Sequence, residues 1–170
     1  MGFRDRLTGT KRPARGVAPR SAEEVRAALL GLNGPKVPYV VRTGAPEGAG
    51  LVAEWRISDP AWHTFFARTR PDRALQVRMR LVPSSCEVRA LDRQWEVTWA
   101  GETPRVAVSA EYSRGQVKTV SRRWTAGRGP DGRLQVTEDF RCDSAQMKNP
   151  LRDAVLEAGW TWRGVAFGKL

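Results

Sequence analysis

The sequence predicts an α+β fold: a strongly curved antiparallel sheet of about eight strands, ordered as a meander that can curl toward a half-barrel, with about three helices packed on it. Both an open curved sheet and a closed barrel stay open as alternatives. Runs in which apolar and polar residues alternate recur between residues 74 and 140. Turn signals separate these runs, and no helical segment lies between them. With 170 residues, of which 41% are hydrophobic, the chain is long and apolar enough for one domain with its own core.

Three segments carry the signals of a helix start. Ser21 and Glu24 have the spacing of a capping box, and apolar residues then recur at helical spacing as far as residue 32. Asp59 stands before a proline and predicts a second helix, which should end before residue 71. Asn149, also before a proline, predicts the start of a third helix, and Gly159 stands where a left-handed residue would end it.

The strands are expected between these helices and after the last of them. The segments with strand composition or alternation are residues 37–43, 51–57, 74–81, 86–90, 95–99, 106–112, 116–124, 134–140 and 160–167. Inward positions change from even numbers in 86–90 to odd numbers in 95–99, so residues 91–93 should form a bulge or a turn.

The chain is strongly basic, with 29 Lys and Arg against 18 Asp and Glu and a net charge of +11. Most of the basic residues are Arg, a preference typical of a GC-rich bacterial genome. Residues 1–20 hold six basic residues and one acidic residue. We expect them to form a basic flexible tail, and residues 21–170 to form a single α+β domain.

The sequence contains no motif of a metal, nucleotide or cofactor site, so no metal and no cofactor are expected. Cys86 and Cys142 lie far apart and form no CxxC pair. His63, the only histidine, is interpreted as an ordinary residue of a short helix. The N-terminus lacks the apolar run of a signal peptide and no segment is apolar enough to span a membrane, which favours a cytoplasmic protein.

The main hypothesis is a non-enzymatic binding or interaction protein with a basic face for an anionic partner, either nucleic acid or an acidic protein. Residues 112–130 contain no acidic residue, and two arginines elsewhere in the chain face away from the interior of a predicted strand. Clustered arginine beside an aromatic residue is typical of surfaces that bind single-stranded nucleic acid. The candidate binding residues are Arg78, Arg80, Arg114, Lys118, Arg122, Arg123, Trp124 and Arg128.

Two alternatives stay open. The seven tryptophans lie in predicted elements, and if some line the hollow of the curved sheet, the protein would hold a small-molecule ligand there. The other alternative is an enzyme of unrecognised type, which would need a group of polar residues around His63, Cys86 or Cys142.

Overall fold

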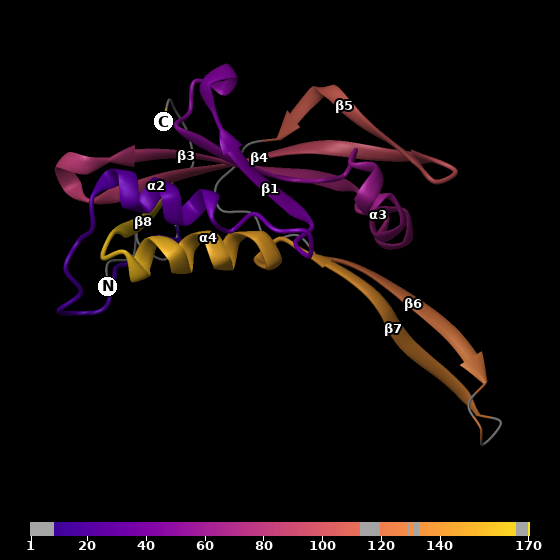
Figure 1. The fold of residues 1–170 in the computed structure, drawn as a ribbon. Helices are drawn as coiled ribbons and strands as arrows, with labels where there is room; N and C mark the ends of the chain where they lie inside the picture. Colours follow the sequence, from indigo (N-terminus) through magenta and orange to yellow (C-terminus); the bar gives the residue numbers. More distant parts are fainter. Residues whose placement is uncertain (1–8, 113–119, 129, 131–132, 166–169) are drawn as a thin grey trace.

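The computed structural model describes residues 9–112, 120–128, 130, 133–165 and 170, with the backbone alone at residues 108–112, 120–128 and 134–142. It confirms the predicted α+β class, a curled sheet with helices packed on it (Figure 1). The helices are α2 (Ala22–Leu30), α3 (His63–Thr69) and α4 (Ala145–Glu157), with short 3-10 turns η1 (Ala45–Glu47), η2 (Pro60–Trp62) and η3 (Pro83–Ser85). The strands are β1 (Tyr39–Thr43), β2 (Leu51–Trp55), β3 (Arg73–Val82), β4 (Glu87–Ala100), β5 (Thr103–Tyr112), β6 (Val120–Arg128), β7 (Leu134–Asp143) and β8 (Thr161–Val165).

The main sheet contains fewer strands than the predicted eight. Strands β1 to β5 follow one another in an antiparallel meander, and β8 joins β4 in parallel, so the sheet has six strands. Strands β6 and β7 pair only with each other in the described part of the chain, and Figure 1 shows them leaving the sheet as a two-stranded arm. The parallel partner arises because α4 returns the chain to the sheet before β8 begins, as crossover connections do.

Strand β4 is a single 14-residue strand where two shorter strands were predicted. Its pairing with β3 is unbroken from Glu87 to Glu96, so the bulge predicted at residues 91–93 is absent. The pairing with β5 shifts instead between Trp95 and Val97. The prediction was misplaced because Asp92 and Gln94 are buried polar residues, and they continue the inward face of this strand beyond residue 90.

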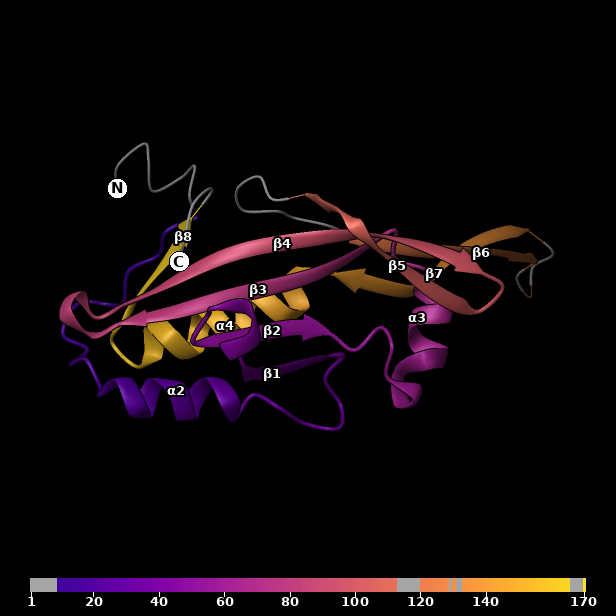
Figure 2. The ribbon, with the colours of Figure 1, turned by 90° about the horizontal axis from the view of Figure 1, so that it is seen from above.

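The core lies between the sheet and the helices α2 and α4, which pack on one of its faces (Figure 2). The α2 side chains Val25 and Leu29 are fully buried, and the sheet contributes alternate residues such as Val77 and Met79 of β3. Because these β3 residues face the helices, the intervening β3 residues face the other way. We call this second face of the sheet the outer face.

The predicted helix starts are confirmed for two helices and wrong for the third. The Ser21 hydroxyl accepts from the Glu24 backbone N–H at 3.2 Å, and the Glu24 carboxylate accepts from the Ser21 N–H at 2.9 Å, which completes the capping box. Asp59 caps η2, which leads into α3, and this helical stretch ends at Thr69. Helix α4, however, begins at Ala145 rather than at Asn149, with Pro150 inside it.

Two local features explain the early start of α4. The Asp143 carboxylate accepts from the Ala145 backbone N–H at 2.9 Å and so supplies a cap that the sequence pattern did not reveal. Pro150 removes one N–H, whose acceptor would be the carbonyl of Gln146, an exposed residue in the first turn of the helix. At the other end Gly159 has φ +74°, as predicted. A Cβ there would come within 2.6 Å of the Ala18 carbonyl oxygen.

Residues 9–20 belong to the segment for which the sequence predicts a flexible tail, and in the structure they run beside the C-terminal elements. Lys11 and Trp162 exchange backbone hydrogen bonds of 2.8 and 2.9 Å. Further along, the Arg20 carbonyl accepts from the Trp160 indole N–H at 2.8 Å, and the Arg20 N–H donates to the Ala158 carbonyl. The predicted domain boundary at residue 20 stays a prediction.

The outer edge of β1 is occupied by side chains rather than by another strand. The Asn33 amide donates to the Val41 carbonyl at 2.8 Å and accepts from the Val41 N–H at 2.7 Å, as a neighbouring strand would. The Tyr39 carbonyl accepts from Arg56, and the Thr43 carbonyl accepts from Arg42. These contacts satisfy an edge that would otherwise be a template for pairing with a second chain.

Replacing Asn33 by Ala should therefore destabilise the fold and promote self-association. The variant leaves a backbone N–H and a carbonyl of Val41 without their partner, which costs about 1–3 kcal/mol. Urea unfolding would measure the stability, and light scattering at increasing concentration would measure association. Lys36→Ala, an exposed position of the same loop, is the control. A monomeric Asn33→Ala protein as stable as this control would contradict the role assigned to Asn33.

A second prediction concerns the ion pair between α4 and β4. The Asp92 carboxylate is fully buried, and the Lys148 ammonium lies 2.5 Å from its Oδ2 atom. Lys148→Met should cost about 3–5 kcal/mol in the free energy of unfolding, since it removes the Lys148 ammonium from a fully buried carboxylate. The double variant Asp92→Leu with Lys148→Met should be more stable than that single variant. Equal stabilities of the two variants in urea titrations would contradict this coupling.

Candidate functional site

An arginine row crosses three strands on the outer face of the sheet. Arg80 of β3 lies directly opposite Arg89 of β4, and Arg89 lies directly beside Arg163 of β8. Side chains at paired positions share a face, and neighbouring strands are about 4.8 Å apart, so three like charges stand next to one another. We call Arg80, Arg89 and Arg163 the arginine row.

Among the side chains that the structure describes, one carboxylate compensates this row. Glu87 accepts from the Arg89 Nε at 2.7 Å and from the Arg163 Nη1 at 3.5 Å. Burial alone would raise the pKa of Glu87, but hydrogen bonds and positive charge from these two arginines outweigh it, and the pKa lies below its ordinary value. Arg80 donates to a main-chain oxygen of Leu170. Even with a full negative charge on that oxygen, the three guanidinium groups would share two negative charges from the described residues, which leaves an excess of positive charge on the row.

A basic hollow of about 420 Å³ adjoins the row. Arg78, Arg80 and Arg93 line it, and Leu91 lies opposite Arg78 in the pairing of β3 with β4. The acidic Glu47 and Leu170, whose main-chain oxygen accepts from Arg80, also contribute to the lining. Guanidinium groups on rigid strands can bind a phosphate or a carboxylate through two parallel hydrogen bonds. The hollow is suited to an anionic group.

A hydrogen-bonded network holds the edge of this hollow. Arg42 binds the carboxylates of both Glu47 and Glu54, with its Nε 2.9 Å from Glu54 Oε1. Gln76 donates to Glu54 Oε2 at 2.8 Å, and its carbonyl oxygen accepts from the Arg78 Nε at 2.8 Å. The two carboxylates raise the pKa of Arg42, and Arg42 in turn lowers the pKa of Glu47. Arg78 is thereby fixed in position on the outer face.

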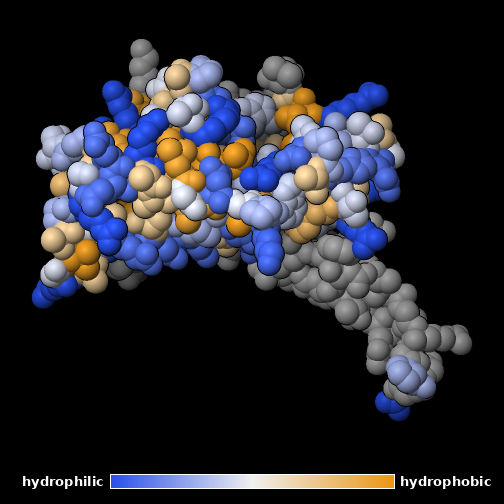
Figure 3. All heavy atoms as spheres, viewed as in Figure 1, coloured by the Kyte–Doolittle hydropathy of each residue, from blue (hydrophilic) through white to orange (hydrophobic). Residues whose placement is uncertain are grey.

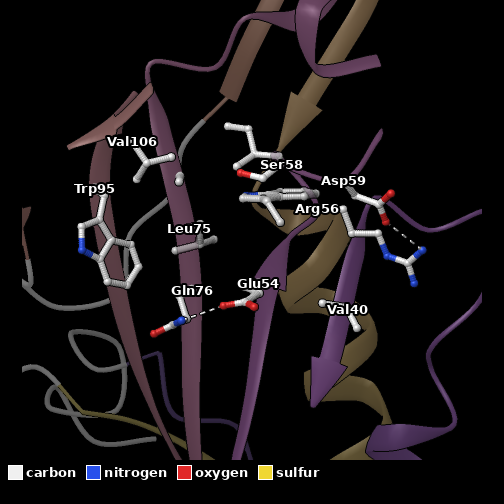
Figure 4. A pocket seen from close by; sticks show the side chains of 12 residues that line it. Val40, Glu54, Arg56, Ser58, Asp59, Leu75, Gln76, Trp95 and Val106 are labelled. Carbon is white, nitrogen blue, oxygen red and sulfur yellow. Dashed lines mark hydrogen bonds and ion pairs between the residues drawn. The ribbon is translucent and has the colours of Figure 1, made fainter. Parts of the chain in front are cut away.

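A second and larger hollow lies where β2 and β3 meet β4 and β5, with a volume of about 680 Å³. Figure 4 shows Trp95 on one side of it, Ser58 and Asp59 on the other, and the bonded pair Glu54 and Gln76 below. Its further lining is mainly apolar: Val40, Trp55, Ile57, Ala74, Leu75 and Val106, with Arg56 at the rim. We call it the tryptophan hollow.

The tryptophans otherwise serve mainly in packing. Trp160 and Trp162 are buried in the core, and Trp55 packs edge-on against Phe66. The side chain of Trp124, a candidate binding residue, is outside the described part of the structure.

The structure brings together only some of the predicted binding residues. Arg78 and Arg80 lie on the outer face, beside Arg89, Arg93 and Arg163, which the sequence analysis missed. The other candidates lie at positions whose side chains or whole residues are outside the described part: Arg114, Lys118, Arg122, Arg123, Trp124 and Arg128. Of these, the last four belong to β6 of the arm.

The residues suited to chemistry are dispersed. The turn that contains η3 and leads to Cys86 lies at the opposite end of the sheet from α3, on which His63 lies (Figures 1 and 2). Within the described residues, no group of three or more His, Cys, Asp or Glu is placed to hold a metal ion. None of the described helices is long and apolar enough to cross a membrane. The face shown in Figure 3 is mainly hydrophilic with smaller hydrophobic areas.

The ion pair between Glu47 and Arg42 makes the stability of the fold depend on pH. Because the folded-state pKa of Glu47 is lowered, its ion pair with Arg42 stabilises the fold fully above about pH 4.5, the ordinary carboxyl value. That contribution disappears as the pH falls through the lower folded-state pKa. Glu47→Gln should therefore lose less stability than wild type between pH 7 and strongly acidic pH in urea titrations, with Glu23→Gln at an exposed position of α2 as the control. Parallel pH curves for wild type and Glu47→Gln would contradict this.

No family model matches this chain, and neither a curated protein nor a solved structure is significantly similar to it.

Proposed function

We propose that this protein is a non-enzymatic binding protein that holds nucleic acid on the outer face of its sheet. The observation that carries the proposal is the arginine row. Like charges at directly opposed sheet positions destabilise the fold, and Glu87 is the one carboxylate described in contact with two of the three residues. A bound row of phosphates would supply the missing negative charge.

The arrangement favours a polymer over a single small anion. Basic positions continue along the strands from the row to Arg78 and Arg93, and alternate residues of a strand are about 6.7 Å apart. A repeating set of guanidinium groups fits a backbone with repeating phosphates. The net charge of +11 would also speed the approach of a polyanion.

The arm formed by β6 and β7 supports the same proposal. It extends away from the main sheet (Figure 1), and residues 112–130, which include β6, contain no acidic residue. A two-stranded ribbon is a form in which proteins reach along nucleic acid. An acidic protein would share the charge but would not present phosphates at regular spacing, so we favour nucleic acid.

The proposal predicts a salt-dependent affinity that depends on the arginine row. A labelled oligonucleotide titrated in gel-shift experiments at several salt concentrations should bind wild type, and Arg80→Gln with Arg89→Gln should weaken binding roughly tenfold. The slope of log K against log salt should fall by about 2, since two fewer phosphates are neutralised by the protein. Lys36→Gln with Arg68→Gln removes the same charge from exposed positions off the outer face and is the control.

The two variants separate the proposal from a general effect of charge. If the control pair weakens binding as much as the Arg80 and Arg89 pair, the arginine row is not the site. If wild type binds no nucleic acid at low salt, the proposed function is wrong.

A further inference from the structure

We infer that the bound nucleic acid is single-stranded and that the tryptophan hollow takes one of its unstacked bases. The inference rests on the proposed function and specifies the form of its ligand. Its basis is that the hollow and the arginines lie along one track on the outer face.

The track is defined by the register of β3 and β4. Their pairing is regular from Arg73 with Glu96 to Val82 with Glu87, so every second residue of β4 projects from the same face. Going along β4, these residues are Arg89, Leu91, Arg93 and Trp95. Trp95 is thus about 20 Å from the arginine row, with Arg93 between them.

The hollow at the end of this track is suited to a neutral aromatic group. Trp95 lines it from the outer face, the buried Trp55 lies beneath, and most of the remaining lining is apolar. Its volume of about 680 Å³ is in the range of small-ligand sites. Trp95 is only half-buried, and Val106 beside it is 36% exposed, so the hollow is open to an incoming group. Bases stack on exposed indole rings whatever their sequence.

The polar lining excludes a phosphate and accepts the edge of a base. Glu54 and Asp59 contribute carboxylates, which disfavour a phosphate there. Glu54 is bonded to Arg42 and Gln76, and Asp59 accepts from the Ala61 N–H, so a base edge would have to share these acceptors. The nearby Arg56 is engaged, with its Nε donating to the Tyr39 carbonyl at 3.0 Å and its Nη1 3.9 Å from Asp59. A strand with one base in the hollow and the phosphates of its neighbouring nucleotides on the arginines therefore matches the charge of both sites.

The two sites are also joined physically. Gln76 lines the tryptophan hollow, and its side chain links Glu54 in that hollow to Arg78 in the basic hollow. This network fixes the groups of the two sites relative to each other, so one strand can occupy both. A base-paired duplex keeps its bases stacked inside and cannot place one in the hollow without losing that stacking.

The test compares three probes by the quenching of tryptophan fluorescence and by competition. They are a single-stranded oligonucleotide of mixed sequence, the duplex of the same length, and inorganic polyphosphate. We expect wild type to bind the single strand at least tenfold more tightly than the duplex. Trp95→Leu should weaken binding of the single strand roughly tenfold, Trp95→Phe should keep most of the affinity, and polyphosphate binding should be unchanged in both.

The controls keep the inference separate from the proposed function. Trp62→Leu removes a half-buried tryptophan that packs on Phe65, outside the hollow, and should bind the single strand as wild type does. Urea midpoints verify that each variant folds. If Trp95→Leu does not fold, the preference of wild type for the single strand over the duplex carries the test. Equal affinity of wild type for single strand and duplex, or unchanged single-strand affinity of a folded Trp95→Leu variant, would overturn the inference while Arg80→Gln with Arg89→Gln still weakens binding. If wild type binds none of the three probes, the proposed function itself is wrong.

Discussion

The structure depends on one long strand, β4, whose two faces and two edges are all used. Strand β3 pairs along one edge of β4. Along the other edge, β8 pairs with the first part of β4 and β5 with the later part, and the partner changes around Asp92. At that point the ion pair with Lys148 fixes α4 on the inner face. The outer face of the same strand carries Arg89, Arg93 and Trp95. The core and the candidate interface are therefore set by the register of a single element.

The elements that obey local rules were predictable. The capping box of α2 and the alternation of β3 depend only on near neighbours in the chain, and both appear as expected. The course of β4 was not predictable, because Asp92 and Gln94 are polar residues that lie on a buried face. A pattern of hydrophobicity assigns such residues to solvent, since it contains no information about Lys148, which lies 56 residues further along the chain.

The candidate site, like strand β4, could be predicted only where neighbours in the sequence define it. Arg78 and Arg80 were identified because they alternate with apolar residues within one strand. Their neighbours Arg89 and Arg163 come from two other strands, and one of these pairs in parallel after a helix, so no local pattern relates them. Trp95 was counted with the interior because residues 95–99 alternate. Its half-buried ring instead lines a hollow on the outer face, in line with Arg93.

The cost of the arginine row is itself an argument that the outer face binds something. Cross-strand pairs of opposite charge stabilise a sheet, and the network around Arg42 shows that this chain uses them on the same face. The row departs from that rule at three adjacent positions with Glu87 as the shared carboxylate. Proteins depart from such local rules chiefly where function requires it. A face that served only to cover the core would gain stability from acidic residues at Arg80 or Arg163. The proposed anionic ligand would supply that negative charge and so account for arginine at these positions.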